Sequence, residues 1–344
     1  MVAAVRRAIQ HVADSALFGQ FIRLLESGEK DDDNLLRVLT YHRVDEPASQ
    51  SDLYPGMISA SPEEFAKQMA YVATNYRVVS MWDVLDRFRQ QRPLPPRSVL
   101  ITFDDAYRDF ATKAWPILQN HHLPVTLFVP TAFPGEPQRC FWWDRMYRAI
   151  GSNRALQLCE TPWGPASLTS DAERLGLFKR LKEHVKSLPH TEAMSLVDRL
   201  CVDENTKQEC ASNQVLNWDE LRCLADNGVT LAPHSRTHPL MNRISPRQAI
   251  DEALGSLNDL QSQIEGNLAP VLAYPAGGVN EATVDALRGS DIELAFTTRR
   301  GVNDLTSADP LRLRRINIGR RTTLNLLRAQ LVPQARLLNH CWAN

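Results

Sequence analysis

The chain of 344 residues is 43% hydrophobic and 23% charged, a composition typical of globular proteins, and its length accommodates one large α/β domain with insertions or two ordinary domains. Its 39 basic and 40 acidic residues give a net charge of −1 without a basic stripe, so no nucleic-acid partner is expected. No apolar run approaches the roughly 20 residues that span a bilayer, so no transmembrane segment is expected.

The N-terminal segment, residues 1–34, is expected to be a helical extension. An Arg6-Arg7 pair is followed by an amphipathic helical pattern that His11 and Asp14 interrupt. The segment therefore lacks the uninterrupted apolar core of a signal peptide. We interpret it as a helix that docks on the protein or contacts a membrane surface, and we expect a cytoplasmic protein.

The six cysteines are scattered along the chain and form no C-x-x-C motif. They are Cys140, Cys159, Cys201, Cys210, Cys223 and Cys341. This spacing argues against both a disulfide framework and a thiolate zinc site. We therefore expect free, buried thiols.

From residue 35 onward, apolar strand patterns alternate with amphipathic helical patterns. The expected strands are 35–44, 77–80, 98–103, 124–130, 229–235, 270–278, 292–298 and 311–319, and the expected helices are 61–72, 81–91, 106–121, 217–228, 245–264, 280–289 and 322–331. Such alternation predicts an α/β fold with parallel strands covered by helices, either a barrel or a doubly wound sheet. No glycine-rich phosphate-binding motif is present, so a nucleotide cofactor is not expected.

Residues 132–213 interrupt the alternation. The aromatic stretch 141–150 is predicted to be helical, and the remainder is polar and helical in pattern without a strand signal. We interpret about 140–213 as an insertion into the α/β domain.

Two adjacent carboxylates, Asp104 and Asp105, directly follow the apolar strand expected at 98–103. Catalytic groups of α/β proteins lie at the carboxyl ends of parallel strands. One of the two acids could instead be the N-cap of the following helix. A cap needs a single acid, however, and two adjacent carboxylates repel each other unless a metal, a cation or a proton separates them. The pair therefore favours a functional site.

A pair of histidines, His234 and His238, follows the strand expected at 229–235. The spacing of four predicts that both imidazoles lie on one side of a helical turn, an arrangement common for two ligands of one ion. Solvent-facing loop histidines are the usual alternative. The presence of an acidic pair at an equivalent strand end favours a metal site, because two imidazoles and a carboxylate suit zinc and leave coordination positions open.

Together these motifs resemble those of the polysaccharide deacetylases of carbohydrate esterase family 4, which share the NodB homology domain. TFDD at 102–105 corresponds to the first family motif, HSRTH at 234–238 to the second, and AYPAG at 273–277 to a divergent third. The resemblance extends over about 35–320 outside the insertion. It implies a distorted (β/α) barrel of about seven strands, in a catalytic domain at 35–332 followed by a C-terminal tail at 333–344.

The resemblance also implies a reaction, the metal-dependent removal of N-acetyl groups from an amino-sugar polysaccharide or glycoconjugate precursor. In this comparison the metal ligands are Asp105, His234 and His238, and Asp104 is the general base that takes a proton from the attacking water. The ion is expected to be zinc, with cobalt, nickel or manganese as alternatives.

The third motif supplies the expected substrate contacts. The backbone N–H of Ala276 matches the family position that holds the oxyanion, and the neighbouring Pro275 and Tyr274 are expected beside it in the pocket. An aromatic cluster at 141–144 has two interpretations, core packing or a sugar-stacking wall, and Trp143 is included among the expected substrate contacts.

Two positions depart from the family pattern. The arginine that usually steadies the base is replaced by Ala273, and Arg43 is considered as a substitute. The acid histidine usually follows a late strand, but no histidine lies in 311–319. In a circularly permuted subgroup that resembles the poly-N-acetylglucosamine deacetylases, this histidine ends the first strand, and LTYH at 39–42 fits. We therefore expect His42 to be the general acid.

Two other functions were weighed. A glycosidase using Asp104 and Asp105 is disfavoured, because its carboxylates flank the scissile bond about 5–9.5 Å apart and need no histidine pair. A carbohydrate-binding pseudo-deacetylase is the second alternative, suggested by Ala273 and opposed by the complete Asp and His set.

Overall fold

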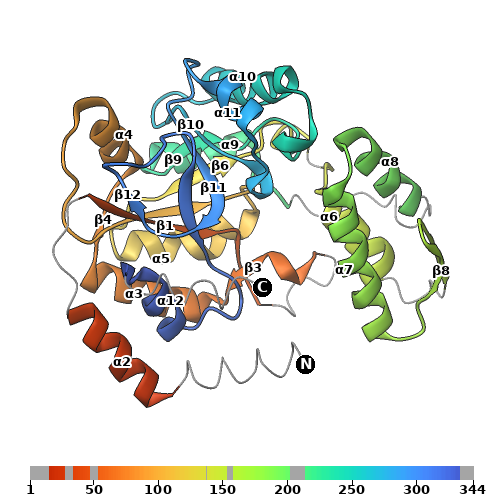
Figure 1. Ribbon diagram of the computed structural model, residues 1–344, viewed down its shortest axis with the longest axis horizontal. Helices are drawn as coiled ribbons and strands as arrows, with labels where there is room; N and C mark the ends of the chain where they lie inside the picture. Colours follow the sequence, from red (N-terminus) through yellow and green to blue (C-terminus); the bar gives the residue numbers. More distant parts are fainter. Residues whose placement is uncertain are drawn as a thin grey trace.

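The computed structural model describes residues 15–27, 34–46, 53–136, 138–152, 158–201 and 214–333. Its centre is a nearly closed barrel of seven parallel strands in the order β10-β11-β13-β1-β5-β6-β9 (Figure 1). These strands are β1 (Leu35–Tyr41), β5 (Ser98–Phe103), β6 (Thr126–Val129), β9 (Thr230–Pro233), β10 (Val271–Ala273), β11 (Leu294–Arg300) and β13 (Leu313–Asn317). The predicted (β/α) barrel is confirmed.

The barrel closes between β9 and the segment that leads into β10. The amide of Leu231 donates to the carbonyl of Asn267, and the amide of Ala269 donates back to the carbonyl of Leu231, each at 2.9 Å. Strands β5, β6, β9 and β10 are buried at every position, as expected for parallel strands covered by helices. This burial explains why the strands are apolar runs in the sequence.

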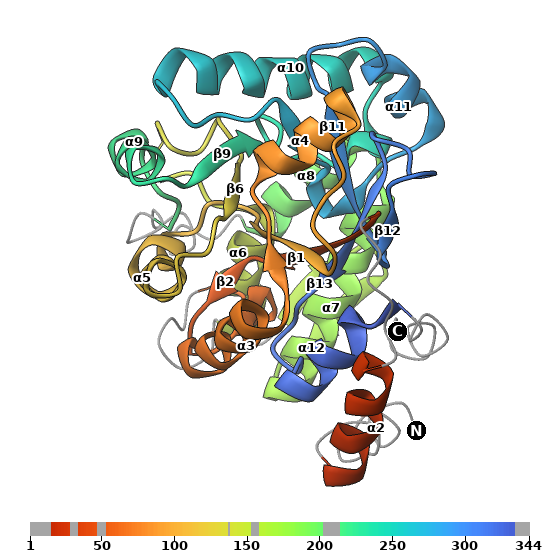
Figure 2. The same cartoon turned by 90° about the vertical axis from the view of Figure 1, so that its left-hand side faces the viewer.

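Helices form the outer layer of the barrel (Figure 2). They are α3 (Pro62–Asn75), α4 (Met81–Gln90), α5 (Trp115–Asn120), α9 (Trp218–Asp226), α10 (Pro246–Gln263), α11 (Glu281–Leu287) and α12 (Leu324–Leu331). Short strands extend the sheets: β4 (Arg77–Val78) pairs with β5, β12 (Asn303–Asp304) pairs antiparallel with β1, and β2 (Arg43–Val44) pairs with β3 (Ile58–Ala60). The predicted alternation is therefore reproduced with small shifts at the element ends.

The register between β1 and β5 fixes the position of the first two candidate residues. Tyr41 pairs with Phe103 at the carboxyl ends of the two strands. The next residues, His42 and Asp104, are therefore neighbours at the same edge, and the amide of Asp104 donates to the carbonyl of Tyr41 at 2.9 Å.

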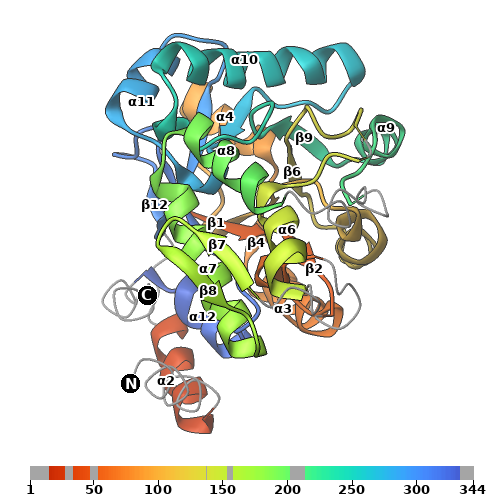
Figure 3. The same cartoon turned by 90° about the vertical axis from the view of Figure 1, so that its right-hand side faces the viewer.

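The insertion lies beside the barrel, as Figures 1 and 3 show for its green helices. It contains α6 (Trp142–Met146), a π-helix η3 (Tyr147–Ser152), a hairpin of β7 (Leu158–Thr161) and β8 (Gly164–Ser167), α7 (Asp171–Ser187) and α8 (His190–Leu200). The prediction of an insertion without strands is wrong at the hairpin. These strands bury few residues, so they lack the apolar alternation by which strands are recognised.

The described part of the N-terminal extension is α2 (Ala16–Ser27), which packs Ile22 against Ala329 and Val332 near α12 (Figure 2). Residues 1–14, with the Arg6-Arg7 pair, and the tail from 334 lie outside the described residues. Within the described ranges, no helix has the length and apolarity to cross a membrane. The membrane-surface contact stays a prediction.

The expectation of six free, buried thiols is wrong. Cys140 is disulfide-bonded, and Cys223 is exposed, whereas Cys159 and Cys201 are buried thiols as expected. Spacing alone could not reveal this, because a disulfide needs proximity in the fold rather than a sequence motif.

Candidate metal centre and active site

Asp104 and Asp105 lie in a turn at the carboxyl end of β5, and both side chains are buried. The backbone at Asp105 and Ala106 has φ values of 72° and 51°, so the chain turns sharply instead of entering a helix. Helical structure begins at Arg108 and continues into the π-helix η2 (Phe110–Ala114). The helix therefore starts two residues later than predicted, after the turn at Asp105 and Ala106, and neither carboxylate caps it.

Asp105, His234 and His238 converge on one point. Oδ1 of Asp105 lies 3.4 Å from Nε2 of His234 and 3.2 Å from Nε2 of His238. One ligand atom from each residue lies within 4.8 Å of the others. Although burial alone raises the pKa of Asp105, the two imidazoles lower it far below its usual value.

The surroundings of this triad fit a bound cation. Both carboxylate oxygens of Asp105 are buried, and neither has a hydrogen-bond partner in the part of the chain that the structure describes. An unpaired buried carboxylate is costly unless a cation compensates it. A donor set of two imidazoles and one carboxylate is common for zinc. The residues present therefore fit a divalent metal.

A loop, rather than the predicted helical turn, brings the two histidines together. Ser235 and His238 both have φ of 61°, and the hydroxyl of Ser235 accepts a hydrogen bond from the amide of His238 at 3.1 Å. The two imidazole centroids lie 4.9 Å apart. The two imidazoles are close together as predicted, but left-handed residues rather than a helical turn bring them together, and their binding of one ion stays a prediction.

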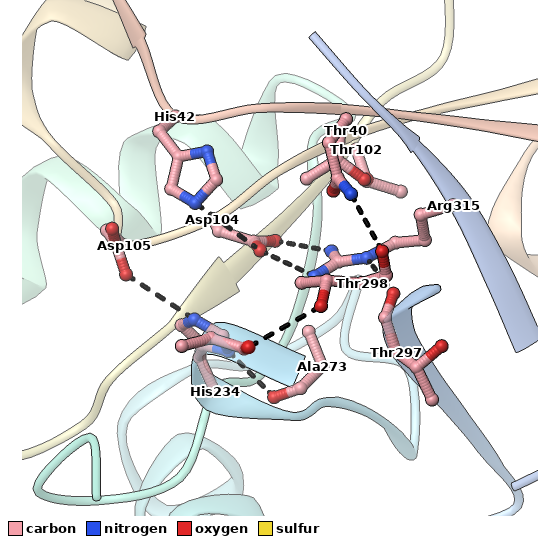
Figure 4. A network of polar contacts seen from close by, with 12 residues as sticks. Thr40, His42, Thr102, Asp104, Asp105, His234, Ala273, Thr297, Thr298 and Arg315 are labelled. Carbon is pink, nitrogen blue, oxygen red and sulfur yellow. Dashed lines mark hydrogen bonds and ion pairs between the residues drawn. The ribbon is translucent and has the colours of Figure 1, made fainter. Parts of the chain in front are cut away.

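The ring of His234 is oriented by its second nitrogen. Nδ1 lies 2.7 Å from the carbonyl oxygen of Ala273, which can only accept a hydrogen bond. The proton therefore sits on Nδ1, and the lone pair of Nε2 faces Asp105 (Figure 4). Burial lowers the pKa of His238, which favours the neutral imidazole that metals bind.

Asp104 is held by Arg315, a buried residue of β13. Nη1 and Nη2 of Arg315 each donate to one carboxylate oxygen of Asp104 at 2.8 Å, and its Nε donates to the carbonyl of Thr297 at 2.9 Å. Burial alone raises the pKa of Asp104, but Arg315 and the nearby His234 and His42 lower it below its usual value. Asp104 is therefore an ionised carboxylate in a fixed orientation.

Arg43 was considered as a substitute for the arginine that steadies the base, but it does not contact Asp104. Arg43 instead forms ion pairs with Asp45 at 2.9 Å and with Asp109 at 3.3 Å. Ala273 occupies the position of the family's usual arginine. Arg315, from a different strand, contacts Asp104 instead. The sequence signal that we missed is an arginine inside a predicted core strand.

His42 follows β1 and lies on the other side of Asp104 from Arg315 (Figure 4). Its Nε2 is 3.9 Å from Oδ2 of Asp104, and its side chain is 27% exposed. The amide of His42 donates to the hydroxyl of Ser59 at 2.9 Å, which fixes the backbone there. The structure therefore brings His42 together with the acidic pair.

A cavity of about 380 Å³ opens over these residues. Its lining comprises His42, Tyr54, Gly56, Met57, Ile58, Ser59, Asp105, Trp142, Trp143, Lys182, Lys186, His234, His238, Ala276, Thr298, Asn317 and Ile318. A cavity of this size suits a small ligand or one end of a larger one.

The third motif lines this cavity only in part. Ala276 lies in a tight turn with φ of 49° and borders the cavity. Pro275 is buried, and the fully buried Tyr274 donates its hydroxyl to the carbonyl of Leu311 at 3.0 Å. Neither borders the cavity, so the structure corrects the expectation that they face the substrate. Pro275 precedes the exposed turn, and Tyr274 anchors it.

With this geometry established, the chain can be compared with known proteins. A family model described as polysaccharide deacetylase matches residues 91–153 and 192–295. These parts of the chain form a polysaccharide deacetylase domain. The matched ranges contain the acidic pair and both histidines, whereas His42, Arg315 and most of the insertion lie outside them.

Curated relatives of this polysaccharide deacetylase domain carry related names. It is 33% identical over 141 residues to the poly-beta-1,6-N-acetyl-D-glucosamine N-deacetylase of Escherichia coli strain K12, a match that covers 36% of this chain and 20% of that protein. It is 28% identical over 112 residues to the protein of the same name from Staphylococcus epidermidis, covering 30% and 38%. The matches thus span well under half of these relatives.

Solved structures share the fold. The Streptococcus pyogenes deacetylase PplD in complex with acetate has a TM-score of 0.59 at 19% identity, covering 87% of this chain and 99% of that one. IcaB from Ammonifex degensii has a TM-score of 0.55 at 18% identity, covering 87% and 97%. These similarities in fold cover most of the chain.

In this polysaccharide deacetylase domain, the aromatic cluster both packs in the core and borders the cavity. The ring of Trp143 stacks on Phe141 at 4.5 Å and meets His238 edge-on at 5.1 Å. Its Nε1 donates to the hydroxyl of Tyr107 at 2.9 Å, which donates to Asp144 at 2.9 Å. Trp143 is nearly buried, which confirms core packing, and it also lines the cavity, so the sugar-stacking role stays a prediction.

Asp144 should make stability depend on pH. Burial raises the pKa of this carboxyl from 3.8 to about 6. The folded chain therefore holds an extra proton between these pH values, and this group stabilises the fold less as the pH rises through them. Asparagine does not titrate, so the stability of Asp144→Asn relative to the native chain should improve by up to about 3 kcal/mol between pH 4 and 7.

Urea unfolding of both proteins at several pH values measures this difference. Comparing the two chains at each pH cancels the titration of all other groups. A difference that stays constant would show that Asp144 has its ordinary pKa in the folded chain, and one that falls with rising pH would show a lowered pKa; either result would contradict the expectation.

Proposed function

We propose that this chain is a metal-dependent hydrolase that removes N-acetyl groups from an amino-sugar polysaccharide or a glycoconjugate precursor. The observation that carries the proposal is the buried Asp105–His234–His238 triad, whose carboxylate has no hydrogen-bond partner among the described residues. It lies on the floor of a cavity, beside an ionised Asp104. The match to the polysaccharide deacetylase family model supports the same reaction.

The ligands of the ion would be Asp105, His234 and His238, and zinc suits this set best, with cobalt, nickel or manganese as alternatives. When bound, a divalent ion supplies Lewis acidity at the acetyl carbonyl oxygen. The chain holds two of its ligands in place through the contact of His234 with Ala273 and the Ser235 turn.

Three groups of the chain would perform the proton transfers and charge stabilisation. Asp104, ionised and fixed by Arg315, accepts the proton of the attacking water. His42 borders the cavity next to Asp104 and donates a proton to the departing amine. The amide of Ala276, in the exposed turn after Pro275, is positioned at the cavity to hold the oxyanion.

Other functions are less well supported. A glycosidase needs two carboxylates that flank the substrate, whereas Asp104 is engaged by Arg315 and Asp105 faces two imidazoles. A binding pseudo-deacetylase remains the alternative to an enzyme, but Arg315 supplies the steadying arginine whose absence suggested it. The cytoplasmic location stays a prediction, and the disulfide at Cys140 weighs against it because disulfides persist in oxidising compartments.

Metal binding gives a direct test of this assignment. Asp105→Ala and His234→Ala should each lose the bound zinc and all N-acetyl hydrolysis, because a three-ligand site with one ligand removed binds the ion weakly. The measurements are zinc content after dialysis and acetate release from a panel of N-acetylated sugars and oligomers, with and without added zinc.

His184→Ala is the matched control, because His184 lies on α7 beside Trp163 and does not border the cavity. It should keep zinc and activity. Full zinc content in both Asp105→Ala and His234→Ala would contradict the ligand assignment, and acetate release that persists after chelation would contradict metal dependence.

A further inference from the structure

Two lysines of the insertion line the same cavity as the candidate metal centre. Lys182 and Lys186 are four residues apart on α7, so they lie on one face of that helix. Both border the cavity, together with His42 and the metal-ligand triad. Figures 1 and 3 show α7 together with the other green elements of the insertion on one side of the barrel. Residues 154–191, which include both lysines, fall outside the family match.

The positive charge of these lysines is poorly compensated within the chain. Nζ of Lys182 lies 5.3 Å from the ring centroid of Tyr54, and its carboxylate neighbour, Glu183, is 3.7 Å away with a side chain that is 71% exposed. Such an exposed pair contributes little. No carboxylate of the described residues lies within ion-pair distance of Lys186.

Lys186, like Lys182, is partly buried. Burial, and then the proximity of Lys182, lower the pKa of Lys186. Lysines that merely cover apolar surface extend their ammonium groups into bulk water. Covering apolar surface can explain Lys182, which lies over the ring of Tyr54. It does not explain why a second lysine, Lys186, lines the same cavity. An anionic ligand in that cavity would compensate both.

We propose that Lys182 and Lys186 bind a phosphate group carried by the substrate, so that the enzyme acts on phosphate-bearing amino-sugar glycoconjugates. This inference rests on the proposed function: the acetamido group would lie at the triad and the phosphate at the lysines, in one cavity of about 380 Å³. Phosphate fits better than a carboxylate, because its charge of about −2 matches two ammonium groups and its several oxygens accept from both.

The experiment compares three sugars: N-acetylglucosamine 1-phosphate, the neutral methyl glycoside of N-acetylglucosamine, and N-acetylglucosamine linked to glucuronate. The variants are Lys182→Met, Lys186→Met and the double variant, since methionine keeps an apolar stem and removes the charge. Lys179→Met, an exposed lysine of the same helix, is the matched control.

The native chain should prefer the phosphate sugar over the methyl glycoside by about 10-fold or more in kcat/KM, as expected for charge-assisted hydrogen bonds. The double variant should lose this preference mainly through a higher KM, and Lys179→Met should keep it. An equal preference in the native and double-variant chains would overturn the proposal. An equal gain with the glucuronate sugar would overturn the choice of phosphate.

A binding measurement separates this inference from the proposed function. Calorimetry of inorganic phosphate and of N-acetylglucosamine 1-phosphate with the metal-free full chain requires no turnover. The native chain should bind both about 10-fold more tightly than the double variant. If the native chain binds phosphate more tightly than the double variant but releases no acetate, the proposed reaction fails and the phosphate site stands. Equal binding by the two chains refutes the phosphate site whatever the activity.

Discussion

Asp104→Asn is expected to lower the rate of N-acetyl hydrolysis by about 100- to 10,000-fold while the chain keeps its zinc. The amide cannot accept the proton of the attacking water, but it retains an oxygen that can accept from Arg315. The metal ligands Asp105, His234 and His238 are unchanged. Acetate release and zinc content, measured on the same preparation, check both parts of the expectation.

The informative comparison is with His42→Ala, the variant of the proposed acid. It should also keep zinc, and its loss of activity should be smaller on a substrate whose leaving group departs as a stable anion, such as 4-nitrophenyl acetate, whereas Asp104→Asn should lose activity on both. A normal rate for Asp104→Asn would exclude Asp104 as the base. Loss of zinc in Asp104→Asn would make it a ligand instead.

The candidate active site could be predicted because its residues directly follow buried strands. Asp104 and Asp105 end β5, His234 follows β9 and His42 follows β1, and in a parallel barrel all these ends meet at one edge. Apolar runs that stop at polar residues mark such ends in the sequence, because only the buried part of the strand must be apolar. The parallel α/β class and the convergence of these residues therefore followed from local patterns, whereas the choice of a barrel over a doubly wound sheet came from the family resemblance.

Arg315 could not be found in the same way. The stretch that contains it has three arginines, Arg312, Arg314 and Arg315, and the pattern does not say which of them points inward. The register between β11 and β13 shifts between Phe296 and Arg300, where Arg300 comes to lie opposite Arg315. Such an irregularity re-aims side chains and depends on long-range pairing, so the burial of Arg315 beside Asp104 emerges only in three dimensions.

The same limit applies to backbone turns. The approach of His234 and His238 depends on left-handed residues at Ser235 and His238, which are neither glycine nor asparagine. The spacing of four correctly predicts that the two imidazoles lie close together. The helical turn that it also predicts is absent. The lysines of α7 were missed for a related reason: a charged helix face usually faces solvent, and only the packing of the insertion on the barrel places Lys182 and Lys186 at the cavity.

The Asp104–Arg315 pair should dominate the stability of this edge of the barrel. Arg315→Met is expected to destabilise the fold by about 3–5 kcal/mol, because it leaves the Asp104 carboxylate buried and uncompensated. The double variant Asp104→Asn/Arg315→Met removes both charges and should be more stable than Arg315→Met alone, since methionine packs well in a buried site. Urea unfolding of the four chains gives the coupling free energy.

Arg314→Met is the matched control on the same strand, because Arg314 is exposed, and its effect on stability should stay within about 0.5 kcal/mol. Arg315 acts by positioning Asp104, so surviving Arg315→Met protein should show a lower kcat with little change in KM and with its zinc retained. The double variant should regain stability without regaining activity. A double variant less stable than Arg315→Met would mean that the arginine is held chiefly by Thr297, through its bond to Nε, and that Asp104 is steadied by other contacts.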